Sequence, residues 1–188
     1  MLHVPRMAVG MAIAGWLATA PAMAQDLADF SPYVRADGSI LLPDDFRFWR
    51  YLGTWSIAGD DPEGGASGFH NVFTQPGTVD AYRATGAFPD GAVIIKELFG
   101  TATEDMTTGR VSRAHEVEGW FVMIKDAKGR FPDHGLWGNG WGWALFYAED
   151  PSTTITEDYK AECIACHIPA EETDWIYTYG YPVLRDEQ

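Results

Sequence analysis

The sequence predicts an α+β domain that consists mainly of an antiparallel β-sheet with a few short helices. Several strand-like stretches follow one another, separated by turn-forming residues, and helices do not alternate regularly with them. The chain has 188 residues, of which 46% are hydrophobic and 14% aromatic. This length and composition are typical of one globular domain with its own hydrophobic core.

The N-terminal segment has the pattern of a secretory signal peptide. Arg6 precedes an apolar run over residues 7–17, and an A-x-A pattern ends at Ala24. A membrane anchor is the alternative, but glycines interrupt this run, and a membrane span needs about 20 apolar residues. We therefore expect residues 1–24 to be cleaved. Residues 25–188 would then be exported to the periplasm without a membrane anchor.

The charge of the chain narrows the classes of partner. The formal net charge is −14, and loss of the signal segment with its one arginine makes it −15. Such a surface repels nucleic acids and anionic lipids. It favours a basic partner or a neutral or cationic small substrate, and a solvated acidic surface without any partner is the open alternative.

The first half of the mature chain is predicted to contain two strands and two helices. A helix start signal at Pro43 predicts a short amphipathic helix over residues 43–51. Alternating or β-branched residues predict strands, and clusters of Gly, Pro and Asp predict loops. Pro at the start and Gly after the end predict the second helix. The expected order after the first helix is strand 53–57, loop 60–65, strand 69–74 and helix 76–85.

The second half is predicted to continue the sheet. Turn-forming residues separate three further strand-like stretches, the first of which is rich in Val and Ile. The predicted elements are turn 88–91, strand 92–99, hairpin connection 107–110, strand 111–124, turn 126–129 and strand 141–148.

The motif CIACH at residues 163–167 contains both cysteines of the chain. The order Cys-x-x-Cys-His attaches haem c, because Cys163 and Cys166 can form thioethers with the two haem vinyl groups while His167 binds the iron. A zinc site, a redox dithiol and a disulfide are the alternatives. Structural zinc needs four ligands and no second Cys pair exists, a redox dithiol is expected near a βαβ unit, and neither the dithiol nor the disulfide uses the adjacent histidine.

The position of this motif near the C-terminus bears on the second axial ligand of the iron. Only 21 residues follow His167, and none is a Met. Met106 and Met123 lie upstream, so a Met-ligated electron carrier stays an alternative. We expect a five-coordinate iron with an open face, which indicates binding or chemistry of a small ligand.

Five short motifs resemble those of the cytochrome P460 family, which includes the gas-binding cytochromes c′-β. The resemblance extends over residues 41–184 and implies a mainly antiparallel sheet, a homodimer, and a haem whose distal side faces the sheet. The motifs are GAFPDG at 86–91, IKEL at 95–98, ECIACH at 162–167, TDW at 173–175 and YPVL at 181–184.

Lys96 occupies the position at which the resemblance implies a covalent bond to the haem macrocycle. In a strand, Lys96 shares its face with Ala92, Ile94 and Leu98. A lysine on an apolar face is costly unless it has a use. The alternatives are a side chain that reaches solvent at the strand edge and a structural ion pair with an acid such as Glu97.

Two positions depart from the best-known P460 enzyme. The resemblance places His70 where that enzyme has a distal arginine, and Phe121 where it has a distal carboxylate. A neutral imidazole over the iron could accept protons from a substrate near neutral pH. An apolar cap such as Phe121 is what the gas-binding relatives use, which weighs against hydroxylamine oxidation.

These observations lead to three hypotheses for function. The first is an oxidoreductase that oxidises hydroxylamine or a related small nitrogen compound and delivers electrons to an external acceptor. The second is a non-enzymatic binder of nitric oxide or carbon monoxide, and the third is a small electron-transfer cytochrome. We predict that His70, Lys96 and Phe121 lie together on one side of a pocket, opposite His167.

Overall fold

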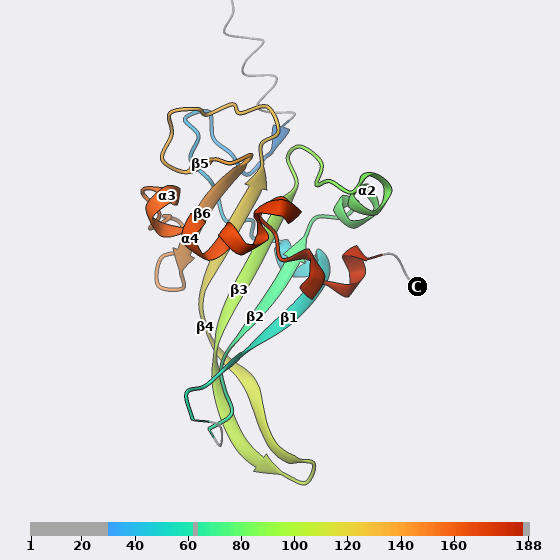
Figure 1. Ribbon diagram of the computed structural model, residues 1–188. Coiled ribbons are helices and arrows are strands. Elements are labelled where there is room, and N and C mark those ends of the chain that lie inside the picture. Colours follow the sequence, from blue (N-terminus) through green and yellow to red (C-terminus); the bar gives the residue numbers. More distant parts are fainter. Residues whose placement is uncertain (1–29, 62–63, 186–188) are drawn as a thin grey trace, which may run out of the picture.

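The computed structural model describes residues 30–61 and 64–185, which form one six-stranded antiparallel sheet with short helices (Figure 1). The strand order is β1-β2-β3-β4-β6-β5. The predicted α+β class is therefore confirmed. The predicted signal peptide and part of the predicted 60–65 loop lie outside the described residues.

All five predicted strands are present, and most are longer than the pattern indicated. β3 and β4 continue past the rest of the sheet as a hairpin, visible in Figure 1, and Met106 pairs with Gly109 at its turn. The very short β5 was not predicted. The strands are β1 Arg50–Ala58, β2 Ala66–Thr74, β3 Val93–Met106, β4 Gly109–Lys125, β5 Trp137–Gly138 and β6 Trp141–Tyr147.

The predicted helix over residues 43–51 is wrong in extent. Only one 3₁₀ turn forms, η1 at Phe46–Phe48, and the backbone of Trp49 is already extended. Arg50 and Tyr51 pair with β2 instead. Local start signals cannot outweigh the pairing of these residues in the sheet.

The second predicted helix is confirmed as α2, Thr78–Thr85. Gly86 ends it in the left-handed conformation with φ 76°, as the Gly stop signal predicted. Pro76 lies before the N-cap residue Gly77 rather than in the first turn. The sequence did not predict α3 Tyr159–Glu162, α4 Ile164–His167 or the 3₁₀ turns η2 Ile168–Thr173, η3 Thr178–Gly180 and η4 Pro182–Leu184.

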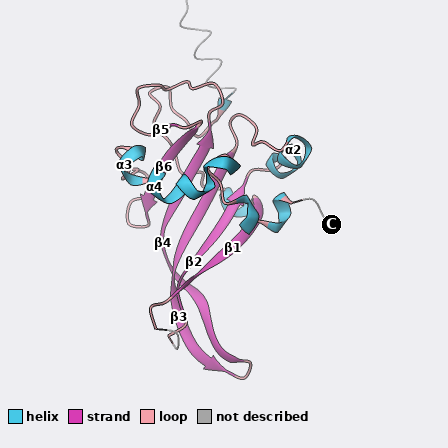
Figure 2. Ribbon diagram, in the orientation of Figure 1, coloured by secondary structure: helices cyan, strands magenta, loops and turns pink. Residues whose placement is uncertain are grey.

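The sheet has two apolar faces, each covered by a different part of the chain. Because strand side chains alternate, Ile94 joins one core while Val93 and Ile95 join the other. The C-terminal helices and turns cross the first face (Figure 2), and the segment before β1 contributes to the second core. No helix in the described part of the chain is long and apolar enough to cross a membrane.

Candidate functional site

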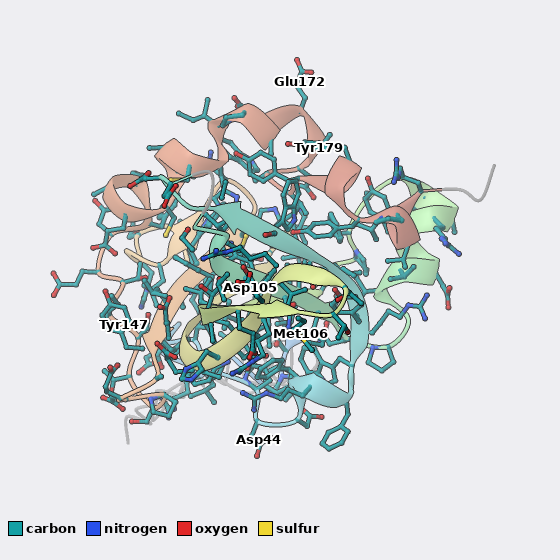
Figure 3. The ribbon with its side chains drawn as sticks, turned by 90° about the horizontal axis from the view of Figure 1, so that it is seen from below. Asp44, Asp105, Met106, Tyr147, Glu172 and Tyr179 are labelled. Carbon is teal, nitrogen blue, oxygen red and sulfur yellow. The ribbon has the colours of Figure 1, made fainter. Side chains whose placement is uncertain are left out.

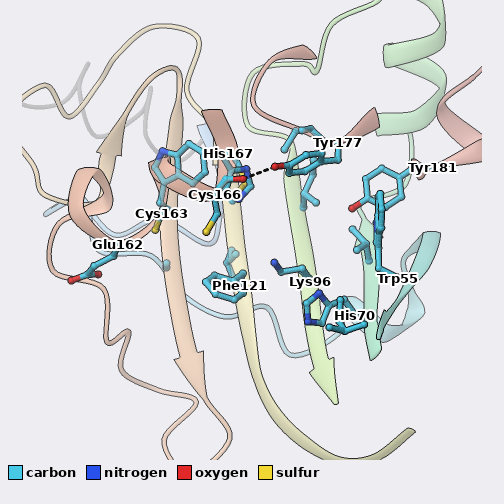
Figure 4. Close-up of a pocket in the computed structure, with 18 of the residues that line it drawn as sticks. Trp55, His70, Lys96, Phe121, Glu162, Cys163, Cys166, His167, Tyr177 and Tyr181 are labelled. Atoms are coloured by element: carbon cyan, nitrogen blue, oxygen red, sulfur yellow. Dashed lines mark hydrogen bonds between the residues drawn. The ribbon is translucent and has the colours of Figure 1, made fainter. Parts of the chain in front are cut away.

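A cavity of about 340 Å³ lies between the first face of the sheet and the C-terminal segment (Figure 4). A pocket of this size is within the ~300–1,000 Å³ range of ligand sites. Its walls are mostly apolar and aromatic. The side chains that line it include Trp55, His70, Lys96, Phe121, Met123, Trp143, Cys163, Cys166, His167, Tyr177 and Tyr179.

One helical turn positions the cysteines and the histidine together. Asp158 caps α3 by accepting a hydrogen bond from the backbone N–H of Lys160 at 2.9 Å, and α4 follows directly. Residues three and four apart share one face of a helix, so Cys163, Cys166 and His167 project together. Figure 4 shows both sulfur atoms directed toward the sheet. All three side chains line the cavity.

His167 is held in the form that binds a metal. Its Nδ1 lies 2.7 Å from the Trp175 carbonyl oxygen, and since a carbonyl only accepts, Nδ1 carries the proton and Nε2 keeps its lone pair. The rings of Trp143 and Tyr177 pack against the imidazole, with centroids 4.9 and 6.1 Å away. Burial lowers the pKa of His167, which favours the neutral imidazole.

The cysteines do not resemble a redox pair. Both are free in the structure. Burial raises the pKa of Cys163 to about 11, and the neighbouring Glu162 contributes in the same direction. Redox-active cysteines have lowered pKa values, because the thiolate is the reactive form. The raised pKa of Cys163 therefore disfavours the redox-dithiol interpretation.

Three side chains of the sheet that line the cavity lie together on the face that is covered by the C-terminal helices. They are His70, Lys96 and Phe121. Lys96 is paired with Phe121 across β3 and β4, and its Nζ lies 4.4 Å from the centroid of the Phe121 ring. His70 is in the adjacent row, because its register partner Leu98 is two residues from Lys96. The predicted grouping of these side chains in one pocket is confirmed, and Figure 4 shows His167 at the other end.

Burial affects the pKa of two of these groups. It lowers the pKa of the Lys96 ammonium. It also lowers the pKa of His70 to about 4, and the positive charge of Lys96 adds to this effect. His70 is thus neutral near pH 7, but it is a weaker base than an ordinary histidine.

The suggested ion pair between Lys96 and Glu97 does not form. Consecutive strand residues point to opposite faces, and Glu97 is buried in the second core with 2% exposure. Its Oε1 accepts hydrogen bonds from Arg47 Nε at 3.0 Å and from Trp120 Nε1 at 3.1 Å. Within residues 30–61 and 64–185, no carboxylate forms an ion pair with Lys96.

Comparison with known families identifies the group of proteins to which this site belongs. The family model described as cytochrome P460 matches residues 43–178. The chain belongs to the cytochrome P460 family. This confirms the resemblance, and haem c is accordingly the cofactor. No protein with curated annotation matches the chain.

The residues of this cytochrome fit a haem c. The cavity has mainly apolar walls, two free thiols stand at one wall, and a neutral imidazole with a free Nε2 stands beside them. Haem needs an apolar enclosure, two thiols for its vinyl groups and an imidazole for its iron. The described residues provide each of these.

Met106 and Met123, the two candidates for a second iron ligand in an electron carrier, differ in position. Met106 is 56% exposed on the projecting hairpin (Figure 3) and does not line the cavity. Met123 lines the cavity, but it is paired with Trp143, whose ring contacts His167. The row of Lys96 and Phe121 separates this end from His70. In the register of the sheet, Met123 is thus in the row of Trp143 and two rows away from His70.

An aromatic wall at the mouth of the cavity was not predicted. The ring of Trp55 packs against those of Tyr177, Tyr179 and Tyr181 at centroid distances of 5.8 to 6.3 Å. The Tyr177 hydroxyl donates to the Cys166 carbonyl at 2.5 Å, which ties this wall to the haem motif. The only sign of this aromatic wall in the sequence was the density of tyrosines after residue 176.

Proposed function

We propose that this cytochrome is an exported oxidoreductase with one haem c, which oxidises hydroxylamine or a related small nitrogen compound and gives the electrons to an external acceptor. The observation that carries the proposal is the amine of Lys96, which lines the cavity and has no acidic partner among the described residues. When bound, haem supplies an iron that takes up the nitrogen compound and accepts its electrons.

Cys163 and Cys166 would attach the cofactor through two thioethers, and His167 Nε2 would bind the iron. The hydrogen bond from Nδ1 to Trp175 supports this role, because it fixes both the tautomer and the ring orientation. Trp143 and Tyr177 pack against the imidazole and would keep water from it.

Lys96 would bond to the haem macrocycle in a two-electron oxidation, in which one N–H bond of the amine and one C–H bond of the macrocycle are replaced by the N–C bond, and a peroxide takes up the two electrons and two protons. A lysine reacts as a nucleophile only when its amine is neutral, and burial favours this form by lowering its pKa. The ring of Phe121 lies beside the amine, with its centroid 4.4 Å from Nζ, and limits where the side chain can move. A cross-linked Lys96 would distinguish an enzyme of the P460 type from its gas-binding relatives.

His70 would receive protons released by the substrate. With the pKa at about 4, this imidazole is a poor base at neutral pH. One cause of the low pKa is the charge of Lys96, which disappears when the amine is bonded to the haem. The proposed bond would therefore raise the pKa of His70 and improve it as a proton acceptor.

Two features of the cavity, Phe121 and the low pKa of His70, favour a second function. This function is the binding of nitric oxide or carbon monoxide without turnover. Phe121 offers an apolar surface where a carboxylate would assist proton transfer. His70 has a low pKa for as long as Lys96 stays charged. Both features suit a neutral diatomic ligand better than a substrate that must lose protons.

One absorption spectrum and one digestion separate the two functions. A red-shifted ferrous Soret band, and a Lys96 peptide that stays attached to the haem peptide of Cys163 and Cys166, are expected for the enzyme. An ordinary five-coordinate spectrum with a free Lys96 peptide would leave the gas-binding function. The same measurements on the variant Lys96→Met show what the bond contributes. Lys160→Met is its matched control, since Lys160 is exposed on α3 and does not line the cavity.

Export and dimerisation belong to the same proposal. Expression with the full N-terminal segment should yield periplasmic protein that begins at Gln25, and an uncleaved membrane-bound product would contradict export. The mature protein should sediment as a homodimer. A monomer at micromolar concentration would contradict the quaternary structure implied by the family.

A further inference from the structure

Two consecutive residues beside the haem motif have an unusual backbone conformation. Asp174 and Trp175 both have positive φ angles, 58° and 66°, although neither is Gly. L-residues rarely adopt this left-handed region, because the side chain approaches the backbone too closely. Such residues persist where the surrounding structure holds them, and they gather at functional sites.

This turn is what brings a carbonyl group to His167. It reverses the chain at the end of η2, where the N–H of Asp174 donates to Glu171 and the N–H of Trp175 donates to Ala170, at 3.1 and 2.8 Å. After the reversal, the Trp175 carbonyl oxygen lies 2.7 Å from His167 Nδ1. The strained turn therefore delivers the hydrogen bond that fixes the imidazole.

Two side chains from the end of the sheet hold the turn. Lys125 Nζ forms an ion pair with Asp174 Oδ1 at 2.6 Å, and its side chain is only 13% exposed. Trp141 Nε1 donates to the backbone carbonyl and the carboxylate of Asp174, at 3.0 and 3.2 Å. Lys125 and Trp141 are register partners at the ends of β4 and β6, so the sheet anchors Asp174 directly.

We propose that the ion pair between Lys125 and Asp174 sets the strength of the hydrogen bond on His167 and thereby the reduction potential of the haem. The inference rests on the proposed binding of the iron by His167. Lys125 and Asp174 do not line the cavity. They are positioning residues that act through the Trp175 carbonyl.

The direction of the effect follows from the chemistry of the imidazole. A carbonyl that accepts a hydrogen bond from Nδ1 makes the other ring nitrogen a stronger electron donor. A stronger donor stabilises ferric over ferrous iron and lowers the reduction potential, one of the ways in which a protein tunes a haem. Loss of the ion pair lets the turn relax, so the potential rises and the bond between iron and histidine weakens.

The test uses the haem-loaded full chain and the variants Lys125→Met and Asp174→Asn. Both should show a more positive midpoint potential and a lower frequency of the iron–histidine stretch in the ferrous form, and Lys125→Arg should restore both values toward wild type. The matched control is Arg113→Met, which breaks an exposed ion pair with Glu104 on the distant hairpin. Its potential and stretching frequency should equal those of the wild type.

Unchanged potential and stretching frequency in folded Lys125→Met or Asp174→Asn would overturn the inference, even if the melting temperature falls, because a purely structural ion pair affects stability alone. If Lys125→Met does not fold, Asp174→Asn decides, since Asn tolerates the left-handed region. Failure of the proposed haem binding is seen separately, as wild-type protein without covalently bound haem.

Discussion

Replacement of His70 by Gln should change how the stability of the protein depends on pH. In the folded protein, burial and then the charge of Lys96 lower the pKa of the His70 imidazole to about 4. In the unfolded chain the same group has its ordinary pKa of about 6.5. Gln is similar in shape and does not titrate, so His70→Gln removes this difference.

The contribution of His70 to the free energy of unfolding follows from the two pKa values. At about 1.36 kcal/mol per pKa unit, the difference between 6.5 and about 4 corresponds to at most ~3.4 kcal/mol. Because His70 is only half-buried, solvent screening reduces this value, and we expect about 1–2 kcal/mol.

The direction in which stability changes with pH depends on whether the folded or the unfolded state binds the proton. Above about pH 6.5 the imidazole is neutral in both states and contributes nothing. Between about pH 6.5 and about pH 4 only the unfolded chain binds a proton, so the wild type loses stability as the pH falls. Below that window both states are protonated and the loss is constant.

Denaturant unfolding of wild type and His70→Gln without haem, in which Lys96 keeps its charge, at about pH 7.5 and about pH 4 measures this effect. The wild type should lose about 1–2 kcal/mol more than the variant on acidification. A difference between the two proteins that is the same at both pH values, or one that favours the wild type at low pH, would refute the assigned protonation of His70.

Three further substitutions test other parts of the site. Lys96→Met should convert the spectrum to that of an ordinary c-type haem and abolish hydroxylamine turnover while covalent haem is retained; an unchanged spectrum would show that Lys96 is not bonded to the haem. His167→Gly should keep both thioethers and lose iron ligation until imidazole is added, and an unchanged ligand-bound spectrum without imidazole would assign the iron to another residue. Glu97→Ala leaves Trp120 without its acceptor and Arg47 without its partner, so denaturant unfolding should show a loss of about 2–3 kcal/mol with an unchanged haem spectrum. A midpoint equal to that of the wild type would show that Glu97 is not important for stability.

The sheet and the haem motif were predictable because their signals are local. Alternation along 69–74 and the β-branched run from Val93 gave both the strands and the faces of their side chains. The same alternation separates Lys96 from Glu97, so the interpretation of Lys96 as half of that ion pair could have been rejected from the sequence. The Cys-x-x-Cys-His order needed no structure at all.

The remaining features depend on contacts between distant residues. The helix predicted after Pro43 stops early because Arg50 and Tyr51 are recruited by β2. The C-terminal turns have at most six residues and are held by packing on β1 and β6, so no periodicity marks them. The low pKa of His70 likewise arises from burial beside Lys96, which only the register of β2 and β3 reveals.

The central claim is that haem is bound covalently through Cys163 and Cys166 with His167 on the iron. Intact mass of the purified mature protein, followed by digestion after acid-acetone treatment, tests it most directly. The account predicts the mass of one haem per chain, resistant to extraction and located on the peptide that contains residues 163–167. Haem that is fully extracted, or a mass that corresponds to a disulfide between Cys163 and Cys166, would contradict it.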